Sequence, residues 1–188
     1  MRAFVKVFVV APLAGLAACA GGAQPQAVAV PDAIKGAPGE QLAVIAPARG
    51  VQIYECRAKK DQPTAFEWAF VGPEADLFDA SGAKIGKHYG GPTWEANDGS
   101  KVVAGVAGRS DVAGTIPWLR LTTKSVAGPA GAFSKVSSIQ RVNTVGGVAP
   151  AAPCTQGNAG TQARIPLHSR LLPAGQVLRL SASRSSGR

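Results

Sequence analysis

Short runs of alternating apolar and polar residues, separated by turn sequences, constrain the fold of this chain most. In residues 66–71 an aromatic side chain occupies every second position, which is the period of a β-strand with one apolar face. Similar strand-like runs occur at residues 42–45, 51–57, 101–106, 116–126 and 134–144. The segments DASG (79–82) and NDGS (97–100), which lie between such runs, are typical of tight turns. The pattern therefore predicts short strands joined by hairpin turns.

The abundance of turn-forming residues favours the same fold class. The 188 residues include 23 glycines and 14 prolines, and no segment has a convincing amphipathic helical pattern. We therefore predict an all-β fold, an antiparallel sandwich or barrel of about eight strands with little helix. We also expect a turn at Arg49-Gly50, a core that covers the aromatic side chains of residues 66–71, and buried positions for Trp68 and Trp118.

The first residues have the composition of a secretory leader. The apolar run at residues 7–16 is shorter than the roughly 20 residues that a membrane-spanning helix needs. The sequence LAAC at residues 16–19 resembles the lipobox of bacterial lipoproteins, which predicts cleavage before Cys19 and lipidation of its sulfur. The alternative is an ordinary cleavage site at residues 18–20, which would release a soluble protein.

These features divide the chain into four parts. Residues 1–18 are a lipoprotein signal peptide, 19–38 a flexible tether, 39–166 a β-rich domain and 167–188 a doubtful tail. The lipobox resemblance implies three acyl chains on the cysteine, and several chains hold a protein at a membrane where one chain holds it only marginally.

The predicted location follows from the residue after the cysteine. Ala20 stands where lipoproteins retained at the inner membrane usually have Asp. We therefore expect an extracytoplasmic protein anchored in the outer membrane, with a soluble periplasmic or secreted form as the alternative.

Cysteine usage supports export. Lipidation or cleavage removes Cys19 from the count, which leaves Cys56 and Cys154. In an oxidising compartment these two thiols either form a disulfide that closes a long loop or stay buried as free thiols.

The net charge of +9 does not indicate nucleic-acid binding. Of the 20 basic residues, Arg2 and Lys6 lie in the leader and four in the tail, which leaves 14 basic against 11 acidic residues between them. No cluster of Lys and Arg is interleaved with aromatic residues there. We expect no nucleic-acid partner, and we expect membrane contact through the lipid anchor; the sequence predicts no particular oligomeric state.

One group of residues has the composition of a ligand site. His88, Tyr89, Trp94, Glu95 and Asp98 combine a titratable ring, two aromatic rings and two carboxylates around a Gly-Gly-Pro turn. Such a segment can line a pocket for a small molecule or a glycan, with Trp94 as a stacking surface. The two carboxylates equally suit the hydrogen-bonding groups of a hairpin turn, and a glycosidase acid and base are the third alternative.

Arg141 completes this candidate binding set. It belongs to a polar stripe that faces either the same cleft or a buried carboxylate such as Glu55 or Glu95. The chain has no G-x-S-x-G elbow, P-loop, dithiol motif or metal-ligand spacing, so we assign no catalytic residue, metal or cofactor.

Two functions are consistent with these residues. The first is a lipid-anchored cell-envelope domain with a non-catalytic binding or structural role. The second is an envelope hydrolase that uses His88 with Glu95 or Asp98. An open pocket that gathers these three groups would favour the hydrolase, whereas carboxylates that serve turns and a separate histidine would exclude it.

Four segments resemble a known family, and they occur in the family's order. They are GVQIYEC (50–56), HYGGPTWE with the following DGS (88–100), IPWL (116–119), and IQRVNTVGG followed by Pro150 and Cys154 (139–154). They are similar to exported bacterial and fungal proteins catalogued as domain of unknown function 3455. The resemblance implies a β-rich exported domain in which the two matching cysteines form a pair. It implies no activity, and no catalytic residue carries over.

The chain departs from this family after residue 166. The family's ending is strand-like and rich in tyrosine, whereas residues 167–172 read LHSRLL. Codons that encode the family's ending would give these six residues if they were translated in a shifted reading frame. We hypothesise a frameshift near Pro166, which would make this chain a non-functional family member; a divergent tail is the alternative. An unbroken frame in independent sequencing reads of the gene would contradict the frameshift.

Overall fold

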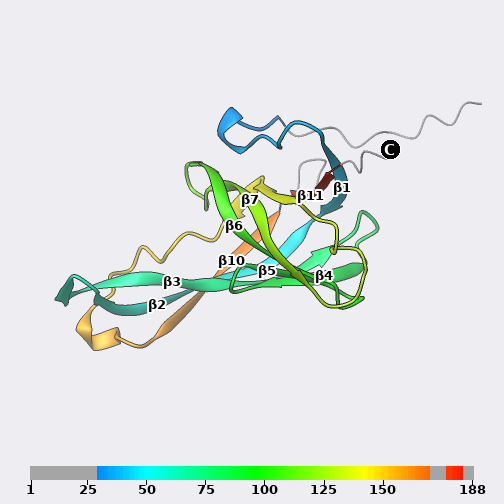
Figure 1. Ribbon diagram of the computed structural model, residues 1–188. Coiled ribbons are helices and arrows are strands. Elements are labelled where there is room, and N and C mark those ends of the chain that lie inside the picture. Colours follow the sequence, from blue (N-terminus) through cyan, green and yellow to red (C-terminus); the bar gives the residue numbers. More distant parts are fainter. Residues whose placement is uncertain (1–28, 170–176, 184–188) are drawn as a thin grey trace, which may run out of the picture.

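The computed structural model describes residues 29–169 and 177–183 and confirms the all-β prediction. Eleven strands and two short 3-10 turns form this part of the chain (Figure 1). The strands are β1 (Glu40–Ala46), β2 (Ala48–Lys59), β3 (Gln62–Phe78), β4 (Lys84–Tyr89), β5 (Thr93–Ala96), β6 (Lys101–Ser110), β7 (Trp118–Ala127), β8 (Ser138–Val142), β9 (Thr144–Gly146), β10 (Gln162–Ser169) and β11 (Val177–Ser183). The 3-10 turns are η1 (Asp32–Ile34) and η2 (Gln156–Asn158).

All eleven strands belong to one antiparallel sheet, in the order β1-β11-β8-β7-β6-β5-β4-β3-β2-β10-β9. The strands from β2 to β8 pair with their chain neighbours. Strands β1 and β2 are separated by one residue in the chain, yet they lie near opposite ends of the sheet order, and the same holds for β8 and β9. A sheet with such connections must curl, and Figure 1 shows β6 and β7 running obliquely away from the layer of β2, β3 and β4.

Single residues make the two corners of the curled sheet. Pro47 separates β1 from β2, where its missing N–H interrupts the hydrogen-bond ladder. Asn143 separates β8 from β9 and is the one non-glycine residue with positive φ, 55°, in the described ranges. The corner at Asn143 divides a run that we expected to be continuous, and β10 and β11 add strands near the end of the chain, so the structure has eleven strands where we expected about eight.

The turn that we predicted at Arg49-Gly50 is wrong, because both residues lie inside β2. Gly50 is needed there for close approach of the neighbouring strand rather than for a turn. A Cβ at this position would lie 2.0 Å from the carbonyl oxygen of Glu74 and 2.5 Å from the Cα of Ala75, both in β3. The missing side chain therefore permits the tight packing of β2 on β3.

We predict that Gly50→Ala lowers the free energy of unfolding by about 2 kcal/mol or more, because the backbone of β3 must move away from the new methyl group. Gly90→Ala is the matched control, since a Cβ at Gly90 has no neighbour within 4 Å, and it should change stability by less than about 0.5 kcal/mol. Urea unfolding of both variants measures the difference. Equal stability of the two variants would contradict the close approach.

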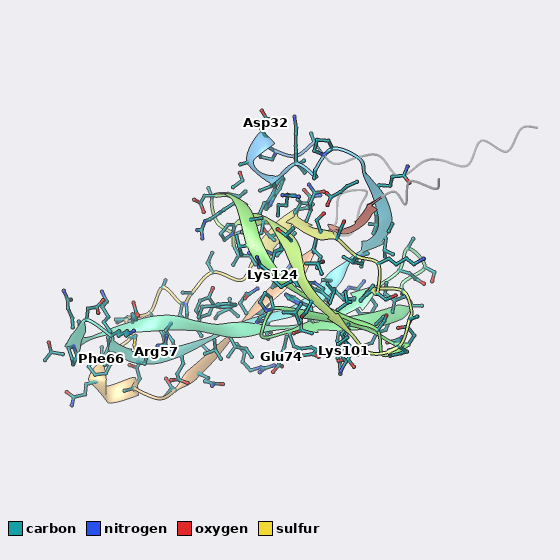
Figure 2. The ribbon with its side chains drawn as sticks, viewed as in Figure 1. Asp32, Arg57, Phe66, Glu74, Lys101 and Lys124 are labelled. Carbon is teal, nitrogen blue, oxygen red and sulfur yellow. A yellow bond between two sulfur atoms is a disulfide. The ribbon has the colours of Figure 1, made fainter. Side chains whose placement is uncertain are left out.

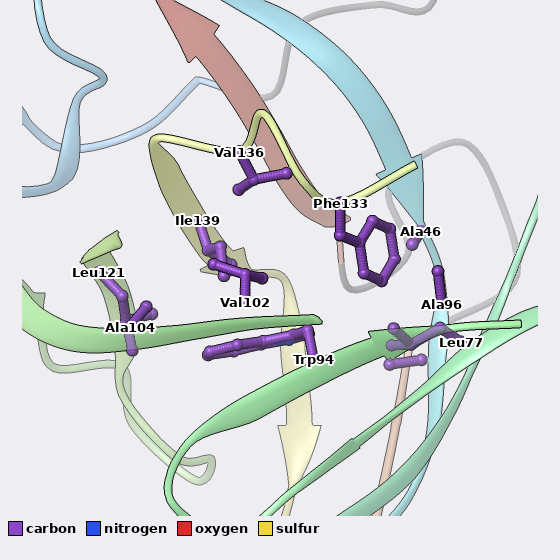
Figure 3. Packing of buried hydrophobic residues seen from close by; sticks show 11 residues of the cluster. Ala46, Leu77, Trp94, Ala96, Val102, Ala104, Leu121, Phe133, Val136 and Ile139 are labelled. Atoms are coloured by element: carbon purple, nitrogen blue, oxygen red, sulfur yellow. The ribbon is translucent and has the colours of Figure 1, made fainter. Parts of the chain in front are cut away.

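The main core lies on one face of the curled sheet, which we call the inner face. Figure 3 shows Trp94 under Val102 and Ile139, with Phe133 beside Ala46. The buried cluster comprises Ala46, Ala48, Leu77, Trp94, Ala96, Val102, Ala104, Leu121, Phe133, Val136 and Ile139. These residues come from both ends of the sheet order, so this core forms only when the sheet curls.

A smaller cluster on the other side of β8 includes a residue of the predicted tether. Ile34 in η1 is fully buried against Val142, with Trp118 packed beside them. The amide of Gln140 donates to the carbonyl of Ile34 at 2.5 Å. Part of the predicted tether (19–38) therefore packs on the domain, because one apolar side chain buries there.

The long hairpin of β2 and β3 forms an arm that extends from the rest of the sheet, with η2 beside its tip (Figure 1). A disulfide joins Cys56 in the arm to Cys154, 98 residues later, which confirms the pair and excludes the free thiols. The backbone of Cys56 also accepts from the amide of Gly160 and donates to the carbonyl of Thr161, at 2.8 and 3.0 Å. The arm is therefore held to the segment around η2 by covalent and hydrogen bonds.

The core that we predicted over the aromatic residues of 66–71 is absent from the described structure. These residues lie in the arm, where Phe66 is marked in Figure 2. Phe70 is 52% exposed, and Trp68 is half-buried and donates its indole N–H to the carbonyl of Ala152 at 2.8 Å. The arm is a single layer of strands, so no second layer covers its apolar side chains.

The predictions for the leader, the lipidated cysteine and the tail concern the two ends of the chain, which lie mostly outside the described residues. The leader and Cys19 fall in residues 1–28. In the described residues, no helix is long and apolar enough to span a membrane. In the predicted tail, β10 continues to Ser169 and β11 pairs with β1 and β8. The frameshift stays a hypothesis.

Candidate functional site

The strand alternation divides five of the six predicted binding residues between two faces of the sheet, and the sixth lies in a turn. His88 in β4 and Trp94 in β5 are register partners on the inner face. Tyr89 and Glu95 follow them in the chain and therefore point to the outer face. Asp98 lies in the turn between β5 and β6. The sequence brings these residues close together, but the structure does not gather them in one pocket.

His88 and Trp94 form a buried stacked pair. Their rings lie 4.2 Å apart between centroids, at an interplanar angle of 9°. The Nδ1 atom of His88 lies 2.9 Å from the carbonyl oxygen of Thr93, and because a carbonyl only accepts, Nδ1 carries the proton. Burial lowers the pKa of His88 from the usual 6.5 to about 4, although the bond to Thr93 opposes this shift. The ring is therefore neutral at neutral pH, and Trp94, 1% exposed, lies in the core instead of serving as a surface for stacking.

Tyr89 and Glu95 form a charged group on the outer face. The hydroxyl of Tyr89 donates to Oε2 of Glu95 at 2.7 Å. Lys87 and Lys101 lie 3.5 and 3.2 Å from the same carboxylate. The hydrogen bond from Tyr89 and the two ammonium groups lower the pKa of Glu95, and the bond to this carboxylate raises the pKa of Tyr89. Glu95 therefore stays ionised, which does not suit a general acid.

Asp98 organises a turn. Its Oδ1 accepts from the amide and the hydroxyl of Ser100 at 2.8 and 2.6 Å, and its Oδ2 accepts from the amide of Ala132 at 2.8 Å. The hydroxyl of Ser100 and these amides lower the pKa of Asp98. Because Ser100 also accepts from the amide of the core residue Phe133, at 3.0 Å, the carboxylate links the β5–β6 turn to the loop that closes the core.

This geometry does not support the hydrolase alternative. His88 is on the inner face, Glu95 is ion-paired on the outer face, and Asp98 holds backbone amides in a turn. None of the three hollows lined by residues 49–89, 112–146 and 59–67 gathers the three groups. No group of three or more His, Cys, Asp and Glu side chains in the same residues is placed to hold a metal ion.

Arg141 lies in β8, two residues after the core residue Ile139, and so faces the inner side. Its Nε and Nη2 both donate to the carbonyl oxygen of Pro117, at 3.3 and 2.8 Å. Burial lowers the pKa of Arg141 to about 10, where the guanidinium is still charged at neutral pH. The predicted partnership with Glu55 or Glu95 is wrong, because Arg141 bonds a backbone carbonyl instead.

A row of alternating charges across the outer face was not predicted. In strand register, Arg49, Asp76, Lys87, Glu95 and Lys101 lie side by side on β2 to β6. Glu74 and Lys101 mark this face in Figure 2. Alternating charges on neighbouring strands stabilise one another, but only the register shows that these residues form one row.

A hollow of about 330 Å³ opens on the same face, and it includes two of the predicted residues. It is lined by Arg49, Gly50, Glu74, Ala75, Asp76, Lys87, His88 and Tyr89. Its charged groups already have partners in the protein: Lys84 lies 2.5 Å from Asp76, Arg164 bonds Glu74, and Arg49 lies over the ring of Phe78. No carboxylate or cation named here is left for a ligand.

The fold and these contacts define the protein as a disulfide-bonded, antiparallel all-β domain. The family described as Protein of unknown function (DUF3455) matches residues 37–167, so the chain belongs to this family, and the resemblance seen in the four segments is confirmed. No curated protein and no solved structure matches the chain.

We predict that the buried His88 makes the protein less stable in acid. The unfolded chain binds a proton near pH 6.5, but folded His88 binds it only near pH 4, so stability falls as the pH drops through this range. The protonation of this histidine alone should lower the free energy of unfolding by about 2.5 kcal/mol between pH 7.5 and pH 4.5. Urea unfolding at the two pH values measures the loss.

The variant His88→Phe should keep an aromatic ring against Trp94 and lack this part of the pH dependence. The other histidine, His168, is exposed, so His168→Phe controls for the removal of a histidine. A wild-type pH profile in His88→Phe would contradict the assigned burial.

Proposed function

We propose that this protein is a lipid-anchored domain of the cell envelope that binds a small molecule or a glycan and catalyses no reaction. The observation that carries this proposal is that the candidate catalytic groups are occupied by the protein itself. His88 is stacked and neutral, Glu95 is ion-paired and Asp98 holds a turn. A rigid β scaffold with no available acid and base suits recognition better than hydrolysis.

The disulfide supports the extracytoplasmic location. Structural disulfides persist in oxidising compartments and are rare where thiols are kept reduced. The Cys56–Cys154 bond closes a segment of 98 residues, so a reducing compartment would remove a large constraint on the unfolded chain. Together with the leader and the lipobox-like LAAC at residues 16–19, this favours anchoring through Cys19.

We predict that the mature wild-type protein carries lipid on Cys19. In cells supplied with an alkyne analogue of palmitate, the wild-type protein should be labelled and should fractionate with the outer membrane. Cys19→Ala should lose the label. Ala20→Asp is the matched control, because it should keep the lipid and move the protein to the inner membrane. An unlabelled mature protein that begins at Gly21 would contradict the anchor and favour the soluble form.

We predict that the folded domain binds a small molecule or a glycan and does not convert it to a product. In a thermal-shift screen of neutral glycans and metabolites, a ligand at 100 times its dissociation constant should add about 2.7 kcal/mol of stability, a rise of several degrees in Tm. Chromogenic glycosides and esters should remain intact with the same protein. No shift with any compound at millimolar concentration, or hydrolysis that requires His88, would contradict this role.

A further inference from the structure

The four segments that identify the family meet around Arg141. The hydroxyl of Tyr54, in the first segment, donates to the carbonyl of Gly147, in the fourth, at 2.7 Å. Arg141, also in the fourth, donates to Pro117, in the third. The charge of Arg141 acts on His88, in the second segment, and on Tyr54. Residues from 54 to 147 along the chain are thus brought together by the curling of the sheet.

Arg141 has no compensating negative charge in the described part of the chain. None of the ion pairs in these residues includes it. The other charged side chain that acts on it is Arg109, which has the same sign. In register, Arg109, Leu119 and Arg141 form one row on the inner face. A cation in such surroundings is costly unless an anion pairs with it.

The inner face is open to solvent beside this row. Val106 is the register partner of the core residue Leu121, yet Val106 is 60% exposed. Arg109 is exposed as well. The sheet therefore leaves part of its inner face uncovered next to Arg141, where a ligand can approach.

The corner after Arg141 also leaves room for a small molecule. A hollow of about 370 Å³ is lined by residues 112–115 and residues 143–146. The first range lies just before Pro117 in the chain, and the second lies just after Arg141. Asn143, at this corner, has the positive φ noted above. Strained backbone of this kind concentrates at functional sites.

A second buried donor lies on the inner face. The indole N–H of Trp94 has no acceptor among the described atoms, and its ring stacks on His88. A buried donor of this kind is costly unless it meets an acceptor. Within the described residues, the inner face thus carries a guanidinium without a carboxylate partner and an indole N–H without an acceptor.

We propose that Arg141 is the cation of a binding site on the inner face for the carboxylate or phosphate group of a small molecule. A guanidinium presents five N–H donors in a planar fork, and the bonds to Pro117 involve only Nε and Nη2. The remaining donors suit an oxyanion, which is acceptor-only and pairs well with a planar cation. This proposal rests on the proposed binding function and names the class of ligand.

The test measures anion binding by the folded protein and by two arginine variants. Inorganic phosphate and succinate serve as probes, titrated calorimetrically at constant ionic strength made up with chloride. We expect wild-type protein to bind one of the probes, which distinguishes a phosphate from a carboxylate ligand. Arg141→Gln should weaken this binding at least tenfold, the loss expected for a charge-assisted hydrogen bond, and Arg141→Lys should weaken it less.

The matched control is Arg164→Gln, which removes the same charge from the outer face, where Arg164 is exposed and bonds Glu74. It should bind the probe as wild-type protein does. Equal losses in Arg141→Gln and Arg164→Gln would show an effect of net charge alone and overturn the site. Unchanged binding in a folded Arg141→Gln, or no binding of either probe by wild-type protein, would also overturn it.

A measurement on wild-type protein keeps the proposal testable if Arg141→Gln does not fold. Phenylglyoxal modifies arginine side chains, and peptide mass spectrometry reports each position separately. The bound probe should protect Arg141 and leave Arg164 reactive; equal protection of both would overturn the proposal. If anions fail but neutral glycans raise Tm in the screen above, this inference fails and the proposed binding function stands.

Discussion

The curling of one sheet at two single-residue corners is the constraint on which the rest of the structure depends. Pro47 and Asn143 each turn the chain between strands that lie near opposite ends of the sheet order. This turning brings β8 over the hairpins of β4 to β6, so that Ile139 packs with Trp94 and Val102. Burial of these apolar side chains stabilises the curled sheet, and the side chains meet only when the sheet curls. The core and the curl therefore form together. The close approach of β2 and β3 at Gly50 belongs to the same geometry.

The two faces of the curled sheet have different electrostatic character. On the outer face, charges alternate along the register from Arg49 to Lys101, and each carboxylate meets a cation. On the inner face, Arg141 bonds the carbonyl of Pro117 and has no ion pair within the described residues, and burial holds His88 neutral. Each ion pair on the outer face contributes little to the stability of the fold, because solvent screens its charges. The buried charge of Arg141 is costly without an anion beside it, which is why we propose that a ligand anion pairs with it.

Local patterns predicted the parts of the site that depend on neighbours in the chain. The Asp98-Gly99 turn followed from turn chemistry, and the strand at residues 51–57 followed from the period of two. The partner of Arg141 could not be predicted, because the choice between Glu55, Glu95 and a carbonyl depends on which strand lies opposite. The predicted core over residues 66–71 was wrong for a similar reason. The pattern showed an apolar face, but it did not show that this face belongs to an arm with one layer.

The sequence by itself determined the fold class, the cysteine pair as one of two outcomes, and the family through four ordered segments. Each of these depends on residue type and local spacing, which the chain carries directly. Only the tertiary structure decided that Cys56 and Cys154 are bonded, that Tyr89 and Glu95 face away from His88, and that Arg141 meets Pro117. These are relations between strands distant in the chain, and they are set by register and by the two corners. A pattern of period two shows that residues alternate between faces, but not which face becomes the interior.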